Sequence, residues 1–112
     1  MNKEIASHFE QFKLFFEQEI LSQAPFQLLE LNYTPYCFGN GHAVYRQKGR
    51  NIEILYDGKE FYYLIRISPL HVKYKGSHDT SKWEVLFEKK TEENLTMSQE
   101  EKVWLLSTLG LS

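Results

Sequence analysis

The side chains best suited to chemistry are one cysteine and four histidines, spread widely along the chain. Cys37 and His42 flank a glycine-containing turn, so a thiol and an imidazole that can form a nucleophilic pair lie close in sequence. No lysine or arginine adjoins Cys37, and no helix is expected to start there and stabilise a thiolate. A small-ligand or enzyme site near Cys37, His42 and Tyr36 is therefore an alternative to a plain structural turn.

Other signatures of catalysis and cofactor binding are missing from the sequence. His8, His71 and His78 have neither the His-x₃-His spacing nor the cysteine partners of a zinc site. The Gly39-Asn40-Gly41 run is too short for a dinucleotide-binding loop and precedes a strand rather than a helix. There is also no phosphate-binding P-loop and no Gly-x-Ser-x-Gly elbow. We therefore predict a protein that is not an enzyme, with no catalytic residue, metal or cofactor.

The charge composition argues against a general nucleic-acid binder, although one segment is basic. Thirteen Lys and Arg residues stand against fifteen Asp and Glu residues, for a net charge of −2, whereas such binders are usually clearly basic. Residues 46–75 carry seven basic and three acidic side chains, a local charge of +4. Single-stranded nucleic-acid binding through this basic 46–75 segment, with Tyr45, Tyr62 or Tyr74 stacking on bases, is therefore an alternative function.

The sequence also bears on location. One cysteine excludes an intramolecular disulfide and is typical of a reducing compartment. The residues after Met1 open directly into a charged amphipathic stretch without the apolar region of a signal peptide. No apolar run approaches the roughly 20 residues that cross a bilayer. We expect a cytoplasmic protein with no membrane partner.

Apolar residues near the start of the chain follow helical spacing. Residues 5–21 carry an apolar stripe with one member every three or four positions. The stripe consists of Ile5, Phe9, Phe12, Phe16 and Ile20. Leu14 and Leu21 point away from it, toward water. Pro25 ends the helix because it lacks an N–H and biases the preceding residue away from helical geometry.

Alternating apolar and polar residues predict a run of strands downstream of this helix. The expected strands span residues 26–33, 43–48, 51–56, 59–68 and 82–88. Asp57-Gly58 predicts a two-residue type I′ hairpin turn, which sets Ile54 opposite Phe61. Gly49-Arg50 predicts a second tight turn, which sets Ile54 opposite Tyr45. Consecutive hairpins of this kind make an antiparallel meander.

Together these elements predict a single α+β domain over residues 1–112. It is one antiparallel, four- to five-stranded meander sheet packed by the N-terminal helix. A short C-terminal helix starts at a Ser98–Glu101 capping box and ends near Gly110. Strand parity assigns ten side chains to the sheet face under the N-terminal helix: Tyr45, Ile52, Ile54, Phe61, Tyr63, Ile65, Ile67, Trp83, Val85 and Phe87.

The opposite face of the predicted sheet combines an apolar centre with a charged rim, a composition found in protein–protein interfaces. The candidate partner-binding residues are Arg46, Glu53, Leu55, Tyr62, Leu64, Arg66, Glu84 and Leu86. Two other arrangements also account for this face. The C-terminal helix folds over it as a second core layer, or a second copy of the chain covers it in a homodimer.

In its organisation the chain resembles the small immunity proteins with which bacteria neutralise polymorphic toxins. The shared features are the phenylalanine-rich helix at residues 5–20, the meander through residues 51–58 and the capped terminal helix, without a diagnostic motif. The charge of −2 departs from the strongly acidic members that neutralise nucleases. The resemblance implies a bacterial protein that blocks a cognate toxin and assigns no site residues. We therefore expect a non-enzymatic protein-binding module whose partner is a toxin or a second copy of itself.

Overall fold

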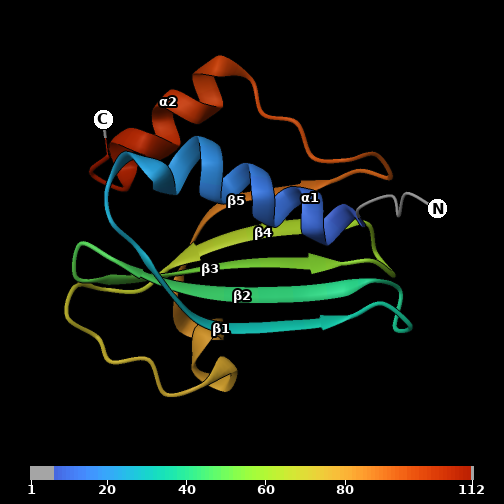
Figure 1. Ribbon diagram of the computed structural model, residues 1–112, viewed down its shortest axis with the longest axis horizontal. Coiled ribbons are helices and arrows are strands. Elements are labelled where there is room, and N and C mark those ends of the chain that lie inside the picture. Colours follow the sequence, from blue (N-terminus) through green and yellow to red (C-terminus); the bar gives the residue numbers. More distant parts are fainter. Residues whose placement is uncertain (1–6, 112) are drawn as a thin grey trace, which may run out of the picture.

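A computed structural model describes residues 7–111, apart from the side chains of residues 77–79. The predictions for Ile5 and for the His78 side chain lie outside the described residues. Five strands form one antiparallel sheet in which each strand lies beside the next along the chain (Figure 1). They are β1 (Gln27–Thr34), β2 (Asn40–Gln47), β3 (Arg50–Asp57), β4 (Tyr62–Ile67) and β5 (Glu84–Lys90). The predicted α+β meander is confirmed.

The helices pack as the apolar stripe predicts, with one exception. The helical elements are α1 (His8–Phe15), the π-helical turn η1 (Phe16–Ile20), the short η2 (Leu21–Gln23) and α2 (Gln99–Thr108). Phe9, Phe12, Phe16 and Ile20 are buried, as predicted. Leu21 is also buried, so its prediction as a water-facing residue is wrong. The π-helical turn widens the coil before Leu21 and thereby rotates this side chain toward the core.

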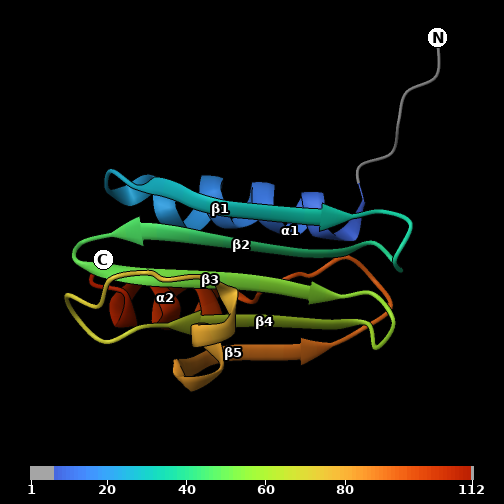
Figure 2. The same ribbon diagram turned by 90° about the horizontal axis from the view of Figure 1, so that it is seen from below.

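Both helices lie on the same face of the sheet (Figure 1). The Ser98–Glu101 capping box of α2 is confirmed, and Leu105 and Leu109 of this helix join the core formed by α1, η1 and the sheet. The alternative in which the C-terminal helix covers the second sheet face is therefore excluded. That face carries instead the segment between β4 and β5, which includes the 3-10 helix η3 (Ser77–Lys82) (Figure 2).

The β2–β3 turn is a type I′ hairpin turn at Lys48-Gly49, one residue earlier than predicted. Both of its central residues have positive φ, 49° at Lys48 and 77° at Gly49. Tyr45 consequently faces Ile52 rather than Ile54. A hydrogen bond from His71 N to Gly49 O, 2.8 Å long, fastens the turn in this position. The shift of two residues leaves every side chain on its predicted face.

The β3–β4 connection is longer than the two-residue turn predicted at Asp57-Gly58. Asp57 pairs with Tyr62, residues 58–61 form the loop, and Ile54 faces Ile65 rather than Phe61. Asp57 Oδ1 accepts hydrogen bonds from the N–H groups of residues 59 and 60, which shapes the loop locally. Phe61 therefore lies exposed in a loop, and its assignment to the core is wrong.

A bulge shifts the register of β5 on β4 and changes the face of several side chains. Leu86 joins the core on the helix side, while Val85 lies opposite Arg66 and is exposed. The prediction that Val85 belongs to the core is wrong for this reason. Trp83 is buried as expected, but its ring packs on Tyr74 of the β4–β5 segment.

Two buried tyrosines predict a loss of stability in alkali. Burial, with a smaller effect of Tyr56, raises the pKa of Tyr63 to about 12, and burial together with the hydrogen bond to Glu17 raises the pKa of Tyr45. A raised pKa stabilises the fold fully below the ordinary value near 10, and this contribution is lost as the pH rises toward the folded value. Urea denaturation at pH 8 and pH 11 should show a loss of about 1 kcal/mol through Tyr63. Tyr63→Phe should flatten this dependence, and an unchanged slope in the variant would contradict the assignment.

Candidate functional site

The sheet face opposite the helices, called here the helix-free face, carries six of the eight predicted partner-binding residues. The register places Arg46, Glu53, Leu55, Tyr62, Leu64 and Arg66 on it. The β5 bulge removes the other two. Glu84 lies opposite the core residue Ile67, and Leu86 belongs to the core.

A buried charge network occupies the centre of the helix-free face. Glu53 of β3 is 1% exposed, and each of its carboxylate oxygens contacts a nitrogen of a basic side chain. Oε1 accepts a hydrogen bond of 2.7 Å from Nε of Arg66 on β4, and Oε2 lies 2.7 Å from Nε2 of His42 on β2. His42 Nδ1 lies 3.6 Å from Oε2 of Glu30 on β1. Acidic and basic side chains therefore alternate across four neighbouring strands.

The network favours the ionised form of Glu53. Burial raises the pKa of this carboxyl, but contacts with His42 and Arg66 and a hydrogen bond with Thr80 outweigh the burial, so the pKa lies below its ordinary value. Both oxygens of Glu53 lie beside a side-chain nitrogen, and both nitrogens of His42 lie beside a carboxylate oxygen. This arrangement is suited to holding strands together rather than to exchanging protons with a substrate.

Residues 69–83 cross the helix-free face and cover its centre (Figure 2). The carbonyl of Val72 accepts hydrogen bonds from Arg46 Nη1 at 2.8 Å and from Asn51 Nδ2 at 2.7 Å. Farther along, the Tyr74 hydroxyl donates to Glu30 Oε1 at 2.6 Å. These bonds explain why this segment, which has no periodic pattern, nonetheless lies against the sheet.

Residues 69–83 reduce the exposed area of the predicted docking surface. Glu53 and Leu64 are inside the protein, at 1% and 6% exposure, whereas Leu55 and Tyr62 keep part of their surface. Beside Leu55, a shallow depression of about 230 Å³ is lined by Asn32, His42 and Asp57, among others. It lies below the size range of most ligand pockets, about 300–1,000 Å³.

The cysteine does not combine with the histidine of the predicted alternative site. Cys37 lies exposed in the β1–β2 turn, where its N–H donates to Thr34 O and its carbonyl accepts from Asn40 N. His42 is engaged with Glu30 and Glu53 in the sheet. Among the contacts of the described residues, none joins Cys37 to His42. The enzyme alternative therefore gains no support from this geometry.

Three exposed aromatic residues lie on the β1–β2 and β3–β4 loops, which contact each other at one end of the sheet, and we call these residues the aromatic end. Tyr36 is 86% exposed, Phe38 66% and Phe61 38%. The Phe38 carbonyl lies so close to Gly58 that a Cβ on Gly58 would be 1.6 Å from it. Asn40 Oδ1 also accepts a 2.7 Å hydrogen bond from Gly58 N. The two loops are thus fastened to each other beside the open part of the helix-free face.

The backbone of the aromatic end is held in an unfavourable conformation. Phe38 and Phe61 have φ values of 59° and 52°, a left-handed geometry that costs a side-chain-bearing residue roughly 1–2 kcal/mol. Phe61 is held in part by its carbonyl, which accepts from Thr91 N at 2.8 Å. The sequence contained one signal for this surface, since Tyr36 and Phe38 stand between Pro35 and Gly39 in a loop, where polar residues are usual.

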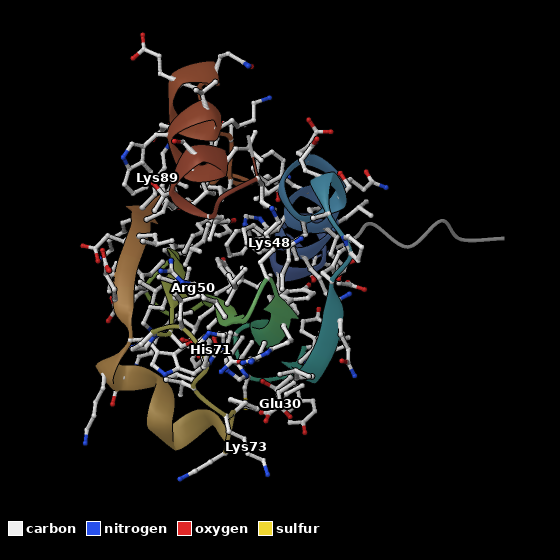
Figure 3. All side chains as sticks on the ribbon, turned by 90° about the vertical axis from the view of Figure 1, so that its left-hand side faces the viewer. Glu30, Lys48, Arg50, His71, Lys73 and Lys89 are labelled. Atoms are coloured by element: carbon white, nitrogen blue, oxygen red, sulfur yellow. The ribbon has the colours of Figure 1, made fainter. Side chains whose placement is uncertain are left out.

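The basic segment divides in the structure. Arg66 is paired with Glu53. Lys48 and Arg50 lie at the β2–β3 turn, to which His71 is hydrogen-bonded, and Lys73 lines a hollow with His71. Figure 3 views these four labelled residues from the left-hand side of Figure 1. The tyrosines predicted to stack on bases are elsewhere or occupied. Tyr45 is buried, Tyr62 is next to the aromatic end, and the ring of Tyr74 packs on Trp83. Tyr74 does line a hollow of about 480 Å³ together with Arg46, His71 and Lys73, so one aromatic side chain lies beside the basic residues. Single-strand binding uses several aromatic side chains on which successive bases stack, and the other two predicted tyrosines do not line this hollow.

A metal site requires a cluster of ligating side chains, and a helical membrane span requires a long apolar helix. Among the side chains of residues 7–76 and 80–111, no group of three or more His, Cys, Asp or Glu is placed to hold a metal ion. None of the helices in the described part of the chain has the length and apolar character needed to cross a bilayer. In comparisons with known proteins, no family model matches the chain, and no curated protein and no solved structure is significantly similar to it.

Proposed function

We propose that this protein is a non-enzymatic protein-binding module that contacts its partner through the aromatic end. The observation that supports this function is the exposure of Tyr36, Phe38 and Phe61 on two loops that are fastened together. Exposed aromatic side chains on a rigid support are the usual anchors of protein interfaces, because they bury a large area and lose little conformational entropy. Leu55 and Tyr62 extend this surface onto the helix-free face.

The partner class that we propose is a toxin protein, which the module neutralises by occupying its surface. This part of the proposal rests on the resemblance in organisation to immunity proteins. It is also consistent with the separate partners of Cys37 and His42, which do not contact each other. The charges around the aromatic end are mixed. Asp57, Glu60 and Glu88 lie near Lys59 and Lys90, and Lys90 pairs with Glu60 at 3.5 Å. Apolar contact rather than net charge is therefore expected to supply most of the affinity.

Replacing both loop aromatics should abolish binding. We expect the Tyr36→Ala/Phe38→Ala variant to lose at least about 100-fold in affinity, because truncating two interface anchors commonly removes several kcal/mol. The measurement is affinity capture from extract of the native host, with retained proteins identified by mass spectrometry and titrated against the purified chain. The matched control is Val103→Ala/Trp104→Ala, which removes an exposed apolar pair from α2.

The outcomes separate the two levels of the proposal. A protein retained by the wild type and by the α2 control but lost by the loop variant supports the binding module. Equal retention by all three chains contradicts the assignment of the aromatic end. A retained partner that is not a toxin leaves the module in place and removes the immunity role.

A further inference from the structure

The two edges of the sheet differ in how they are protected from pairing with another strand. An edge strand turns alternate N–H and C=O groups away from its neighbour, and proteins commonly guard such edges with charged side chains. At one edge, β5 carries Glu84, Glu88, Lys89 and Lys90 among its seven residues. At the other, β1 has eight residues, of which Glu30 is the one charged residue. The β1 edge is thus the less guarded one, because its protection is limited to Glu30 and to the bulge between Leu28 and Glu30.

The side chains along β1 alternate in the manner of a strand that continues a sheet. Leu28, Leu31 and Tyr33 pair with core-facing positions of β2, whereas Glu30 and Asn32 share the helix-free face. Leu28 and Leu31 are nevertheless exposed, because no further strand of the described chain lies beyond β1. The apolar side chains of β1 therefore have no packing partner on the outer side of the strand.

A groove next to β1 provides space for apolar side chains of an added strand. It has a volume of about 350 Å³ and runs between α1 and β1, with Phe9, Leu14, Leu31 and Tyr33 in its lining. Three charged residues also line it: Lys13 and Glu17, which pair with each other at 2.7 Å, and Glu10, which accepts a hydrogen bond from Ser7 N in the cap of α1. Each of these charges keeps its partner when the apolar side chains of an added strand enter the groove.

We propose that β1 pairs antiparallel with β1 of a second copy of this chain, around a two-fold axis at Asn32. The two five-stranded sheets then form one continuous sheet, with both pairs of helices on the same side. Leu31 of each copy lies beside Tyr33 of the other, and these side chains fill the two α1–β1 grooves. Both copies contribute the same patch to this two-fold contact, so the patch is fully used once two chains have associated. The contact therefore yields a dimer rather than a fibre.

Charge excludes a competing register, and the residue pattern of β1 argues for this occupant. A two-fold axis at Asn32 sets Glu30 across from Thr34 of the other copy, so no like charges oppose each other. An axis at Glu30 would place the two carboxylates face to face. The occupant must be a strand with apolar residues on one side, polar residues on the other and little charge, and β1 itself has this pattern. The inference is separate from the proposed function, because it uses the sheet edge rather than the aromatic end.

The first test is the oligomeric state measured by sedimentation. The wild type should sediment with twice the 13.3 kDa mass of the chain. Leu31→Lys should weaken association by roughly 100-fold or more, because it places a charge at two symmetry-related interface positions. Leu31 is 48% exposed in one copy, so the variant should remain folded by circular dichroism. Leu70→Lys, at a 52% exposed leucine away from β1, is the matched control and should remain dimeric.

The second test reports the register. A chain with Asn32→Cys and Cys37→Ser should form an intermolecular disulfide under air, because directly opposed residues of antiparallel strands have Cβ atoms close enough to bridge. The same chain with Lys59→Cys in place of Asn32→Cys should stay unlinked. A monomeric wild type, or a dimer that survives Leu31→Lys, overturns the proposal. A Leu31-dependent dimer in which the Asn32→Cys chain forms no cross-link overturns the register.

Discussion

Glu53→Gln should lower the free energy of unfolding by about 3–5 kcal/mol, the usual cost of removing one partner of a buried ion pair. The amide keeps the size of the side chain but removes the charge that Arg66 and His42 both contact at 2.7 Å. Arg66 is largely covered, so water cannot replace the lost carboxylate. Urea denaturation at pH 7 measures this loss. The effect is large because Glu53 lies in the middle of the sheet and is 1% exposed.

The pH dependence distinguishes a charge effect from a packing effect. A lowered pKa means that Glu53 contributes stability above its ordinary value of 4.5, and that this contribution is lost as the pH falls through the folded value. The penalty of Glu53→Gln should therefore be largest near neutrality and shrink in acid. Glu60→Gln is the control, because Glu60 pairs with Lys90 at the surface, where such pairs contribute at most about 1 kcal/mol. A penalty for Glu53→Gln as small as that of Glu60→Gln would contradict the buried network.

Much of the fold was predictable because an error in the position of a turn, when it shifts the pairing by an even number of residues, leaves each side chain on the same face of the sheet. The β2–β3 and β3–β4 registers are displaced by two and four residues from the predicted pairings. Because both displacements are even, Ile54 and Ile65 still face the helices, and Glu53 and Arg66 still face away. The β5 bulge is an odd displacement, and there the predictions for Val85, Glu84 and Leu86 failed together.

The turns themselves were less predictable, since distant residues decide them. Asp57-Gly58 has the local chemistry of a type I′ turn, yet Gly58 is required here for another reason. The Phe38 carbonyl, twenty positions earlier, occupies the place where a Cβ would lie. Local preference was overridden by a contact between two loops, and no pattern within residues 57–61 indicates it.

The candidate site was predicted only in part, because contacts between residues far apart in the sequence also decide its arrangement. The sequence placed Arg46, Glu53 and Arg66 together on the helix-free face. In the structure Arg66 pairs with Glu53, whereas Arg46 binds Val72 and Asn51. The cover by residues 69–83 was not predictable, because its bonds to the sheet use a backbone carbonyl and isolated polar side chains rather than a periodic apolar face. The aromatic end was hidden by the assignment of Phe61 to the core.

Gly41→Ala should destabilise the fold by about 3 kcal/mol, at the upper end of the usual cost of overpacking a core. Gly41 of β2 lies directly under α1, and an added Cβ would be 2.0 Å from Cγ of the buried Phe9. The ring fills the space that a side chain would need, so α1 must move away from the sheet. The measurement is the change in urea midpoint relative to the wild type.

A double-mutant cycle with Phe9→Ala tests whether the ring causes this cost. Phe9→Ala alone should cost about 3–5 kcal/mol through lost burial and the cavity left behind. In that background the conflict disappears, and Gly41→Ala should add less than about 1 kcal/mol, so the two substitutions are strongly non-additive. Additive losses would mean that residue 41 must be glycine for a reason other than the Phe9 ring. Because the contact joins α1 to the middle of the meander, the coupling energy also measures how tightly the N-terminal helix is held on the sheet.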